Sequence, residues 1–400
     1  MSSGDRNRII IAGAGPVGLV AALLLGRRGI PFTLIEGEDA LSDDLRASTF
    51  HPPTLDLLDA QGLAAPLIAM GLISPTWQIR VHETGERAVF DLAAIAGDTR
   101  HPYRLQCEQS KLCRLLLAQV LAEKRGEVRM GTRLEQVTQD DDGVSVRILA
   151  DGEPGTIEGR YLIGADGSRS AVRHSLGFSF EGKTYPETTI LATTTFPFQD
   201  HLPGLSNVNY VWKAKGTFSL LRLPQLWRCS LYPDPDESIE DGLQPASVQR
   251  KLQEIVPRDE PYEVLEIRAY RIHMRIVDDY RAGRVLLAGD AAHVNSPSGG
   301  MGMNGGIHDA VELVETLADI WNGADERLLD RYTRRRRPVA EAEILGQSDR
   351  NRARMQERDI AKRREMLADL QRIADDPERA RDHLLRSSMI AGLRQAATIA

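Results

Sequence analysis

The chain has 400 residues, of which 42% are hydrophobic and 27% charged, and a formal net charge of −7. This length predicts two to three domains of ordinary size, or one large α/β domain with a smaller one inserted. The negative charge excludes bulk electrostatic attraction to nucleic acid or to an anionic membrane. Three scattered cysteines are too few for a disulfide framework or a four-ligand zinc site, so we expect a reducing compartment and no metal. Without a secretory signal or an apolar run long enough to span a membrane, the expected location is the cytoplasm.

The first chemical motif lies near the start of the chain. An apolar, β-branched run over residues 8–12 is followed by GAGPVG, an apolar helical stretch, and the short strand PFTLIE. Gly13, Gly15 and Gly18 have the G-x-G-x-x-G spacing, and Glu36 ends the second strand. In such a unit the first glycine makes the turn, the second lets a pyrophosphate touch the backbone, and the third lets the helix pack on the sheet. We therefore predict dinucleotide binding, with Glu36 accepting hydrogen bonds from an adenosine ribose.

The next segments predict a sheet of a different kind. Gln109 begins an amphipathic helix, residues 127–147 alternate as strands do, and residues 161–164 form a strand before a turn at Asp166 and Gly167. From about residue 188 to 232 the pattern changes to short alternating runs, typical of an antiparallel sheet inserted into the nucleotide domain. From residue 328 onward we expect charged helices, interrupted chiefly at Pro338 and Pro377. The arginine run 334–337 is followed by Glu341 and Glu343, which favours a solvated helix face.

The segment from Gly289 to Ala310, GDAAHVNSPSGGMGMNGGIHDA, is dense in glycine and lies between an apolar strand and a helix. Glycine clusters mark tight turns, positive φ or close approach of a ligand to the main chain. A strand, a glycine-rich turn and a helix N-terminus also form a site for an anionic group. A flexible connecting loop is the alternative interpretation of this segment taken alone.

Together and in this order, GAGPVG, GADGSRSAVR and the glycine-rich segment resemble the single-component FAD-dependent aromatic monooxygenases, the para-hydroxybenzoate hydroxylase-like flavoproteins. The likeness covers roughly residues 8–338. It implies an α/β fold, with a Rossmann-like FAD-binding domain, an inserted and mostly antiparallel β-sheet substrate domain, and a helical C-terminal region. The expected ranges are 1–75, 101–180 and 268–330 for the FAD domain, 76–100 and 181–267 for the substrate sheet, and 331–400 for the helices.

The resemblance also implies roles for particular residues. Asp290 would bind a ribityl hydroxyl, and Pro297 would lie near the flavin ring and the substrate. The backbone N–H groups of the next helix would face the pyrimidine edge of the ring, where they stabilise the anion of reduced flavin. The remaining cofactor-binding residues implied by the resemblance are Arg46, Gln109, Asp166, Gly302, Met303 and Asn304.

The reaction that the resemblance implies begins when NADPH or NADH reduces FAD. O2 then forms a flavin C4a-hydroperoxide, and a hydroxyl group passes to a phenolic or related aromatic ring. Such a pocket must exclude water, and Pro297, Met301, Met303 and Phe218 form a suitable apolar rim. The sequence assigns no catalytic acid or base, because the sheet residues Tyr210, Trp212, Arg222, Tyr232 and His273 lie in no motif. His293 and His308 are expected to be structural, and the assembly is expected to be a monomer or homodimer.

Other functions remain as alternatives. A flavin-dependent oxidase or reductase would share the scaffold, and so would a halogenase, whose W-x-W-x-I-P signature the four tryptophans do not form. A flavin disulfide reductase needs two cysteines facing the ring, whereas Cys107 and Cys113 follow no suitable glycine turn. A non-catalytic nucleotide-binding regulator would leave the second and third motifs unexplained.

Overall fold

The computed structural model describes residues 6–400, so the first five residues of the expected FAD domain lie outside the described residues. Short apolar segments form its central sheet, in the order β18-β19-β12-β1-β2-β8. The strands from β19 to β8 are parallel, and β18 alone runs antiparallel to its neighbour. Their bounds are Ile9–Ala12 (β1), Phe32–Ile35 (β2), Gly126–Arg129 (β8), Tyr161–Gly164 (β12), Arg281–Ala282 (β18) and Val285–Leu287 (β19). Every residue of β1, β2, β12 and β19 is buried, as in parallel sheets covered on both faces.

Helices and a small antiparallel sheet cover this central sheet. Helix α1 (Pro16–Arg27) contacts both α4 (Gln109–Glu123) and α9 (Gly302–Trp321), and eleven of its twelve residues are buried. The antiparallel sheet consists of β9 (Thr132–Gln139), β10 (Val144–Ala150) and β11 (Glu153–Gly159), and it contacts β1 and β2. The short helix α5 (Ala171–Ser175) packs against β9. This is the expected Rossmann-like arrangement, and the fold class is confirmed.

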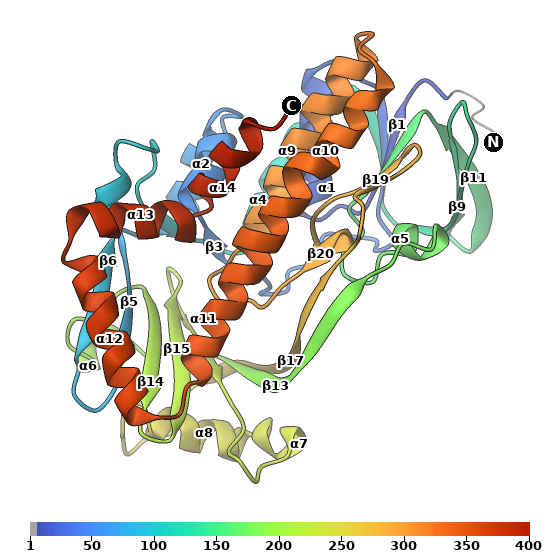
Figure 1. Ribbon diagram of the computed structural model, residues 1–400. Helices are drawn as coiled ribbons and strands as arrows, with labels where there is room; N and C mark the ends of the chain where they lie inside the picture. The colour runs from blue at the N-terminus through green and yellow to red at the C-terminus, as the bar shows by residue number, and fades with distance from the viewer. Residues whose placement is uncertain (1–5) are drawn as a thin grey trace.

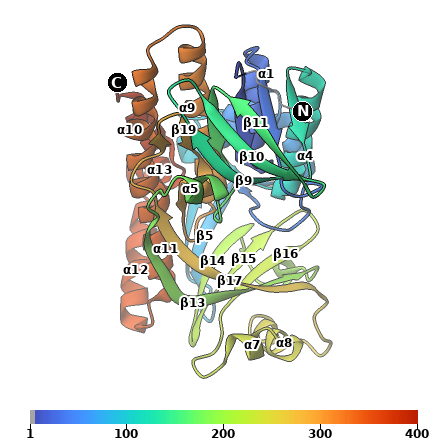
Figure 2. The same ribbon diagram turned by 90° about the vertical axis from the view of Figure 1, so that its right-hand side faces the viewer.

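The second large sheet has eight strands in the order β20-β17-β13-β16-β15-β14-β5-β6. All its pairings are antiparallel except that of β14 with β5. Figures 1 and 2 show the long strands β13 and β17 curving from this sheet toward the nucleotide-binding part. The bounds are Thr76–Val81 (β5), Arg87–Asp91 (β6), Glu181–Thr194 (β13), Val208–Lys213 (β14), Gly216–Arg222 (β15), Trp227–Leu231 (β16), Val264–Ile276 (β17) and His293–Val294 (β20).

The expected domain ranges stay a prediction, and one of their limits falls inside an element. Strand β17 crosses the limit between residues 267 and 268 and pairs with β13 on both sides of it.

Short helices join the strands of the large sheet or follow them: α6 (Phe198–His201), α7 (Ile239–Gly242), α8 (Pro245–Gln253) and the 3-10 turn η1 (Leu92–Ile95). A fourth sheet, again with three strands, contains β3 (Thr49–Phe50), β7 (Arg104–Gln106) and β4 (Leu72–Ser74), with α2 (Pro52–Asp59) and α3 (Ala64–Met70) between β3 and β4.

The C-terminal region is helical, as expected, but Pro338 does not interrupt it. Proline lies inside α10 (Leu329–Val339), and a π-helix, η4 (Ala340–Leu345), leads directly into α11 (Gly346–Gln356). A widened turn accommodates a residue that lacks a backbone N–H, so the helix continues. Pro377 instead begins a helix, since the region ends with α12 (Ile360–Ala374), α13 (Pro377–Ser387) and α14 (Ile390–Ala397). Helix α11 packs on β14 and β15 and helix α12 packs on β6, so the two helices cover part of the eight-stranded sheet.

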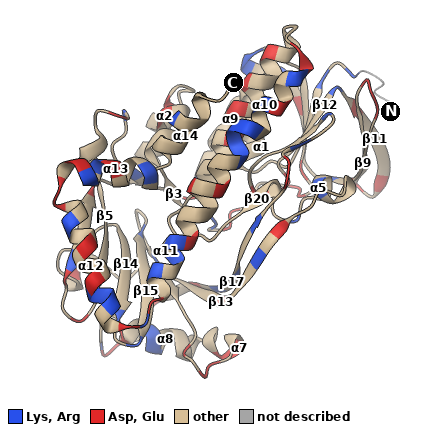
Figure 3. Cartoon of the chain, in the orientation of Figure 1, with Lys and Arg blue, Asp and Glu red and all other residues tan. Residues whose placement is uncertain are grey.

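The arginine run 334–337 is a second difference from expectation. Figure 3 shows basic and acidic residues interspersed along the C-terminal helices, but Arg336 is only 1% exposed and its Nε lies 2.7 Å from Asp309 Oδ1. Arg335 pairs with Glu312 at 3.0 Å, and Arg337 donates to the Val277 carbonyl. The run is therefore not a solvated face, because tertiary partners elsewhere in the chain bind its guanidinium groups.

Candidate active site

A cleft of about 900 Å3 lies between the carboxyl ends of the parallel strands and the eight-stranded sheet. Ten of the residues expected at a cofactor line it: Gly13, Gly15, Glu36, Arg46, Gln109, Asp166, Asp290, Pro297, Gly302 and Met303. Gly18 and Asn304 do not line it. The four residues of the expected apolar rim, Pro297, Met301, Met303 and Phe218, all lie on this same cleft. Segments far apart in sequence thus meet at the position where open α/β sheets bind their ligands.

The glycines between β1 and α1 are required for three different reasons. Gly13 has φ +102°, and a Cβ there would lie 2.4 Å from the Ala165 carbonyl oxygen. A Cβ on Gly18 would lie 1.9 Å from the Gly13 carbonyl oxygen, so the helix can only start this close to the turn without a side chain. A Cβ on Gly15 meets nothing within 4 Å, because this residue faces the open cleft. Gly15 therefore leaves space for a ligand rather than for the protein.

Glu36 connects the turn to the second strand. One of its carboxylate oxygens accepts from Ala14 N at 2.7 Å, and the other accepts from Glu38 N at 3.1 Å. Glu36 also lines the cleft. This position, at the end of β2, is where a carboxylate can receive ribose hydroxyl groups in a dinucleotide-binding fold.

Asp290 presents an unpartnered carboxylate to the cleft. Gly289 adopts φ +60°, which turns the chain after β19, and Asp290 follows in the short 3-10 turn η2 (Gly289–Ala291). Among the described residues, no donor hydrogen-bonds to the Asp290 side chain. Desolvation raises the pKa of Asp290, outweighing the opposite influence of His293 and Arg46. An acceptor that is exposed to the cleft and has no internal partner suits a ligand that brings hydroxyl groups.

Two buried networks hold the glycine-rich loop in place. Asn304 accepts from His51 N at 2.9 Å and donates to the carbonyl oxygens of Thr49 at 2.8 Å and Gly300 at 2.7 Å. Its side chain is therefore occupied with the loop, although its backbone role toward a flavin stays a prediction.

The second network centres on Asp309. This carboxylate accepts from Gly289 N at 3.1 Å, lies 2.8 Å from His293 Nε2, and pairs with Arg336. Although burial acts in the other direction, Arg336 and His293 lower the pKa of Asp309. His293 and His308 are both buried and hydrogen-bonded, the latter to Thr54 Oγ1 at 2.8 Å. Both histidines have structural partners, as the sequence predicted.

The middle motif lies at the same cleft. Asp166 accepts from Val172 N at 3.1 Å at the start of α5, and burial raises its pKa. Arg169 lines the cleft and is available to a phosphate. Arg173 is not, because it donates to the carbonyl oxygens of Ala291 at 2.9 Å and Ser168 at 2.7 Å, with its guanidinium 3.8 Å from the Phe180 ring. Arg173 instead ties the middle motif to the glycine-rich loop.

The opposite wall belongs to the eight-stranded sheet. Of the sheet residues without an assigned role, Tyr210 and Tyr232 line the cleft, whereas Trp212 is buried and donates to the Arg354 carbonyl. His273 bonds Thr184 instead, and Arg222 also lies off the cleft. Sequence reasoning missed three further residues of this wall, Arg228, Thr189 and Tyr270. No local motif distinguishes these three residues from ordinary strand residues.

Arg228 joins the two halves of the site. Its guanidinium donates to the carbonyl oxygens of Arg46 at 2.6 Å and Leu45 at 2.9 Å, and to Ser48 Oγ at 3.0 Å. The sheet wall is thereby connected to the segment that carries Arg46. Tyr232 and Tyr270 lie in the same wall, and burial raises the pKa of each phenol. Their hydroxyl groups therefore stay protonated near neutral pH and can donate to a substrate.

The cysteines have no part in the cleft. Cys107 and Cys113 are buried, and burial raises their pKa to about 11 and about 12. Thiols of this kind are unreactive, which argues against a disulfide reductase.

The described residues include no cluster of three or more His, Cys, Asp or Glu placed to hold a metal ion. In the same part of the chain, every helix is too short or too polar to cross a membrane.

These features define a dinucleotide-binding oxidoreductase whose cleft fits FAD. Gly15 leaves open space in the cleft, and Glu36 and the unpartnered Asp290 line the same cleft, so their roles toward a dinucleotide stay predictions. The family model described as "FAD binding domain" matches residues 6–345, so the chain belongs to this family. The family resemblance noted from the motifs is confirmed.

Individual relatives narrow the class further. The chain is 35% identical over 384 residues to 6-hydroxy-3-succinoylpyridine 3-monooxygenase of Pseudomonas putida (strain DSM 28022 / S16), covering 95% of this chain and 97% of the relative. The crystal structure of p-nitrophenol 4-monooxygenase from Pseudomonas putida DLL-E4 superposes with a TM-score of 0.90 at 30% identity, covering 96% of this chain and 98% of that one. A ternary complex of aklavinone-11 hydroxylase with FAD and aklavinone is similar with a TM-score of 0.78 at 29% identity, covering 89% and 70%. The protein is a FAD-dependent aromatic monooxygenase of the hydroxylase family.

Proposed function

We propose that this protein uses NADPH or NADH and O2 to hydroxylate a small aromatic substrate with one ring, a phenol or a hydroxypyridine. The observation that carries this proposal is the single cleft in which the unpartnered Asp290, the apolar rim and the tyrosine wall meet. The names of two relatives support the choice of ring, since 6-hydroxy-3-succinoylpyridine and p-nitrophenol are each single hydroxylated aromatic rings. Both relatives also match this chain over nearly its whole length.

The chain's own residues would hold FAD along the cleft. Gly15 admits the pyrophosphate, and Glu36 accepts the adenosine ribose hydroxyl groups. Asp290 accepts a ribityl hydroxyl, and the start of α9 at Gly302 and Met303 faces the pyrimidine edge of the ring, where its unpaired N–H groups favour negative charge. Arg46, Gln109 and Asp166 line the same path and complete the set.

When bound, FAD would accept electrons from NAD(P)H and transfer one oxygen atom of O2 to the ring. The protein must then keep water from the reacting atoms, a task suited to Pro297, Met301, Met303 and Phe218. Tyr232 and Tyr270 would orient the substrate hydroxyl by donating hydrogen bonds from protonated phenols. No acid or base on the chain is assigned a proton-transfer step.

The test is a panel of phenols and hydroxypyridines added to the FAD-loaded protein. A true substrate should accelerate flavin reduction by NAD(P)H in anaerobic stopped-flow measurements, and in air the product formed should approach one per NAD(P)H consumed. A Phe218→Ala variant should keep its FAD while losing coupling, because it enlarges the apolar wall only. Reduction that no aromatic compound accelerates, with peroxide accounting for all NAD(P)H oxidised, would contradict the proposal and favour an oxidase or reductase.

A further inference from the structure

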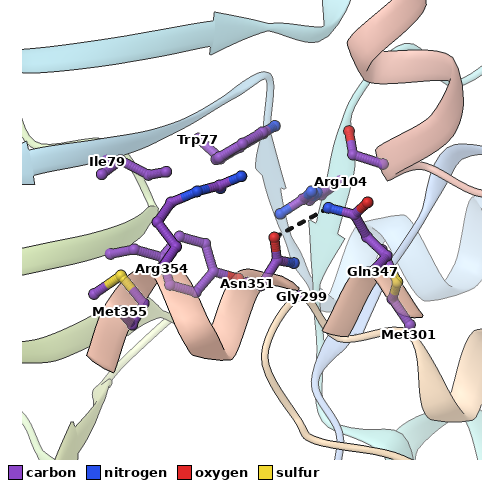
Figure 4. A pocket seen from close by; sticks show the side chains of 11 residues that line it. Trp77, Ile79, Arg104, Gly299, Met301, Gln347, Asn351, Arg354 and Met355 are labelled. Atoms are coloured by element: carbon purple, nitrogen blue, oxygen red, sulfur yellow. Dashed lines mark hydrogen bonds between the residues drawn. The ribbon is translucent and has the colours of Figure 1, made fainter. Parts of the chain in front are cut away.

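A second, smaller cavity lies beside the cleft, and we call it the arginine cavity. It is bounded by Trp77 and Ile79 of β5, Arg104 of β7, Tyr210 of β14, and Asn351 and Arg354 of α11. Figure 4 shows the Arg104 and Arg354 side chains reaching into the same space near Trp77. The cavity has a free volume of about 20 Å3, which is more than one buried water needs. No acidic residue lines it.

Arg104 is buried in this cavity without a counter-ion. It is 3% exposed, and its Nε and Nη1 atoms have no hydrogen-bond partner. Burial lowers the pKa of the guanidinium, and the neighbouring Tyr210 hydroxyl offsets only part of that effect. An unpaired buried charge is among the costliest features a fold can contain. The chain therefore keeps a strong donor here for a group that it does not itself supply.

The other buried arginines show how unusual this is. Arg336 pairs with Asp309 at 2.7 Å, and Arg173 donates to two carbonyl oxygens. Arg363 donates to three, those of Glu357, Lys213 and Gly216. Arg80 donates to the Pro203 carbonyl at 3.3 Å. Among the described residues each of these four donates at least one recorded hydrogen bond or ion pair within the protein, whereas Arg104 leaves its buried Nε and Nη1 without a partner.

A second cation and a third donor converge on the same cavity. Among the residues that the structure describes, Arg354 forms no ion pair and its side chain donates no hydrogen bond. Burial lowers its pKa, and the neighbouring Arg350 acts in the same direction. The Trp77 indole N–H is also buried without an acceptor, with the Arg104 guanidinium 5.1 Å from its ring centroid. Two guanidinium groups and an indole N–H form a donor set that matches a planar oxyanion such as a carboxylate.

The arginine cavity adjoins the end of the cleft where the substrate would lie. Tyr210, Met301 and Met355 line both spaces, and Met301 also belongs to the apolar rim beside Pro297. Unbranched methionine side chains can move aside at small cost, so they can open a path between the two. A ring held at the rim would then direct a substituent on its far side toward Arg104.

We propose that Arg104 and Arg354 bind a carboxylate substituent of the aromatic substrate, so that the substrate class is hydroxyaryl acids. This inference rests on the proposed function and adds the specificity-determining residues to it. A ring that carries a carboxylate fills the donor set, whereas a neutral analogue leaves the buried Arg104 and the half-buried Arg354 unpaired. Discrimination against the neutral analogue should therefore be large, on the order of 30-fold or more, as for removal of one partner of a buried charged pair.

The experiment measures binding without turnover. Hydroxyaryl acids and their methyl esters are titrated into the FAD-loaded protein in the absence of NAD(P)H, and the perturbed flavin absorbance gives a dissociation constant for each. The parent should bind the acid on the order of 30-fold more tightly than the ester. Arg104→Met and Arg354→Met should each remove most of this preference while the ester binds as before. Arg364→Met, which removes an exposed arginine from α12, is the matched control and should leave the preference intact.

The outcomes separate the two proposals. If acid and ester bind the parent equally, or if both arginine variants keep the preference, the carboxylate assignment is wrong even when neutral phenols are hydroxylated. If chloride or acetate stabilises the parent but not Arg104→Met against thermal unfolding, while acids bind no better than esters, the cavity holds a free anion and the assignment is again wrong. If no hydroxyaryl compound of either kind accelerates flavin reduction, the proposed function itself fails.

Discussion

Replacement of Asp290 by alanine separates ligand binding from folding. Among the described residues no donor bonds the Asp290 carboxylate, so its removal leaves no buried hydrogen-bonding group without a partner. The unfolding free energy of the FAD-free protein should stay within about 0.5 kcal/mol of the parent value. A charge-assisted hydrogen bond to a ribityl hydroxyl contributes about 1.5 to 3 kcal/mol, so the Kd for FAD should rise about 10-fold to 150-fold.

Two measurements on the same preparation check this expectation. Titration of FAD-free protein, followed by quenching of flavin fluorescence, gives the Kd, and thermal unfolding without FAD gives the stability. Asp236→Ala removes an exposed carboxylate from the loop before α7 and should change neither quantity. An Asp290→Ala protein that binds FAD as tightly as the parent would refute the placement of the ribityl chain at Asp290. A large loss of stability without FAD would show that Asp290 has a structural partner instead.

The other predictions concern the turn, a buried histidine and the apolar rim. Gly15→Val should fold and lose FAD, because its Cβ enters the open cleft, whereas Gly18→Val should fail to fold, because its Cβ would lie 1.9 Å from the Gly13 carbonyl oxygen. Circular dichroism measures the folding of each variant and FAD titration measures its binding. Two variants that fold and bind FAD equally well would contradict the reasoning. Burial lowers the pKa of His308 from 6.5 to about 3, so the unfolded chain gains a proton first as pH falls below 6.5 and stability decreases. Between pH 7.5 and pH 5 the parent should lose about 2 kcal/mol more than His308→Gln in urea unfolding, and equal losses would place the pH dependence elsewhere. Pro297→Gly should raise the peroxide released per NAD(P)H consumed, since it loosens the rim and admits water, and unchanged coupling would remove Pro297 from the reacting site.

The nucleotide-binding part could be predicted from sequence because its determinants are local. Gly13, Gly15 and Gly18 lie within six residues of one another, and two of the reasons for them are local: Gly13 has φ +102° in the turn, and a Cβ on Gly18 would meet the Gly13 carbonyl oxygen. The contact of a Gly13 Cβ with the Ala165 carbonyl is the one reason that depends on a distant segment. The glycine-rich loop is equally local, since its sequence specifies a strand, positive φ at Gly289 and the start of α9.

The features that sequence reasoning missed depend on distant partners. Arg336 lies in a run that reads as a solvated face, yet Asp309 on α9 binds it in the core. Pro338 predicts a break, but the packing of α10 and α11 on the two halves of the molecule favours one continuous helix with a π turn. Arg104 and Arg354 are separated by about 250 positions, and neither lies in a motif. Only the tertiary fold brings β7 and α11 to the same cavity, so no window of sequence could indicate it.

The central claim is that this chain transfers oxygen from O2 to an aromatic ring. The most direct measurement supplies ¹⁸O2 and NAD(P)H to the FAD-loaded protein with its best hydroxyaryl substrate and analyses the product by mass spectrometry. The account predicts one labelled oxygen atom per product molecule, with product approaching one per NAD(P)H oxidised. An unlabelled product, with all electrons recovered as hydrogen peroxide, would contradict the account.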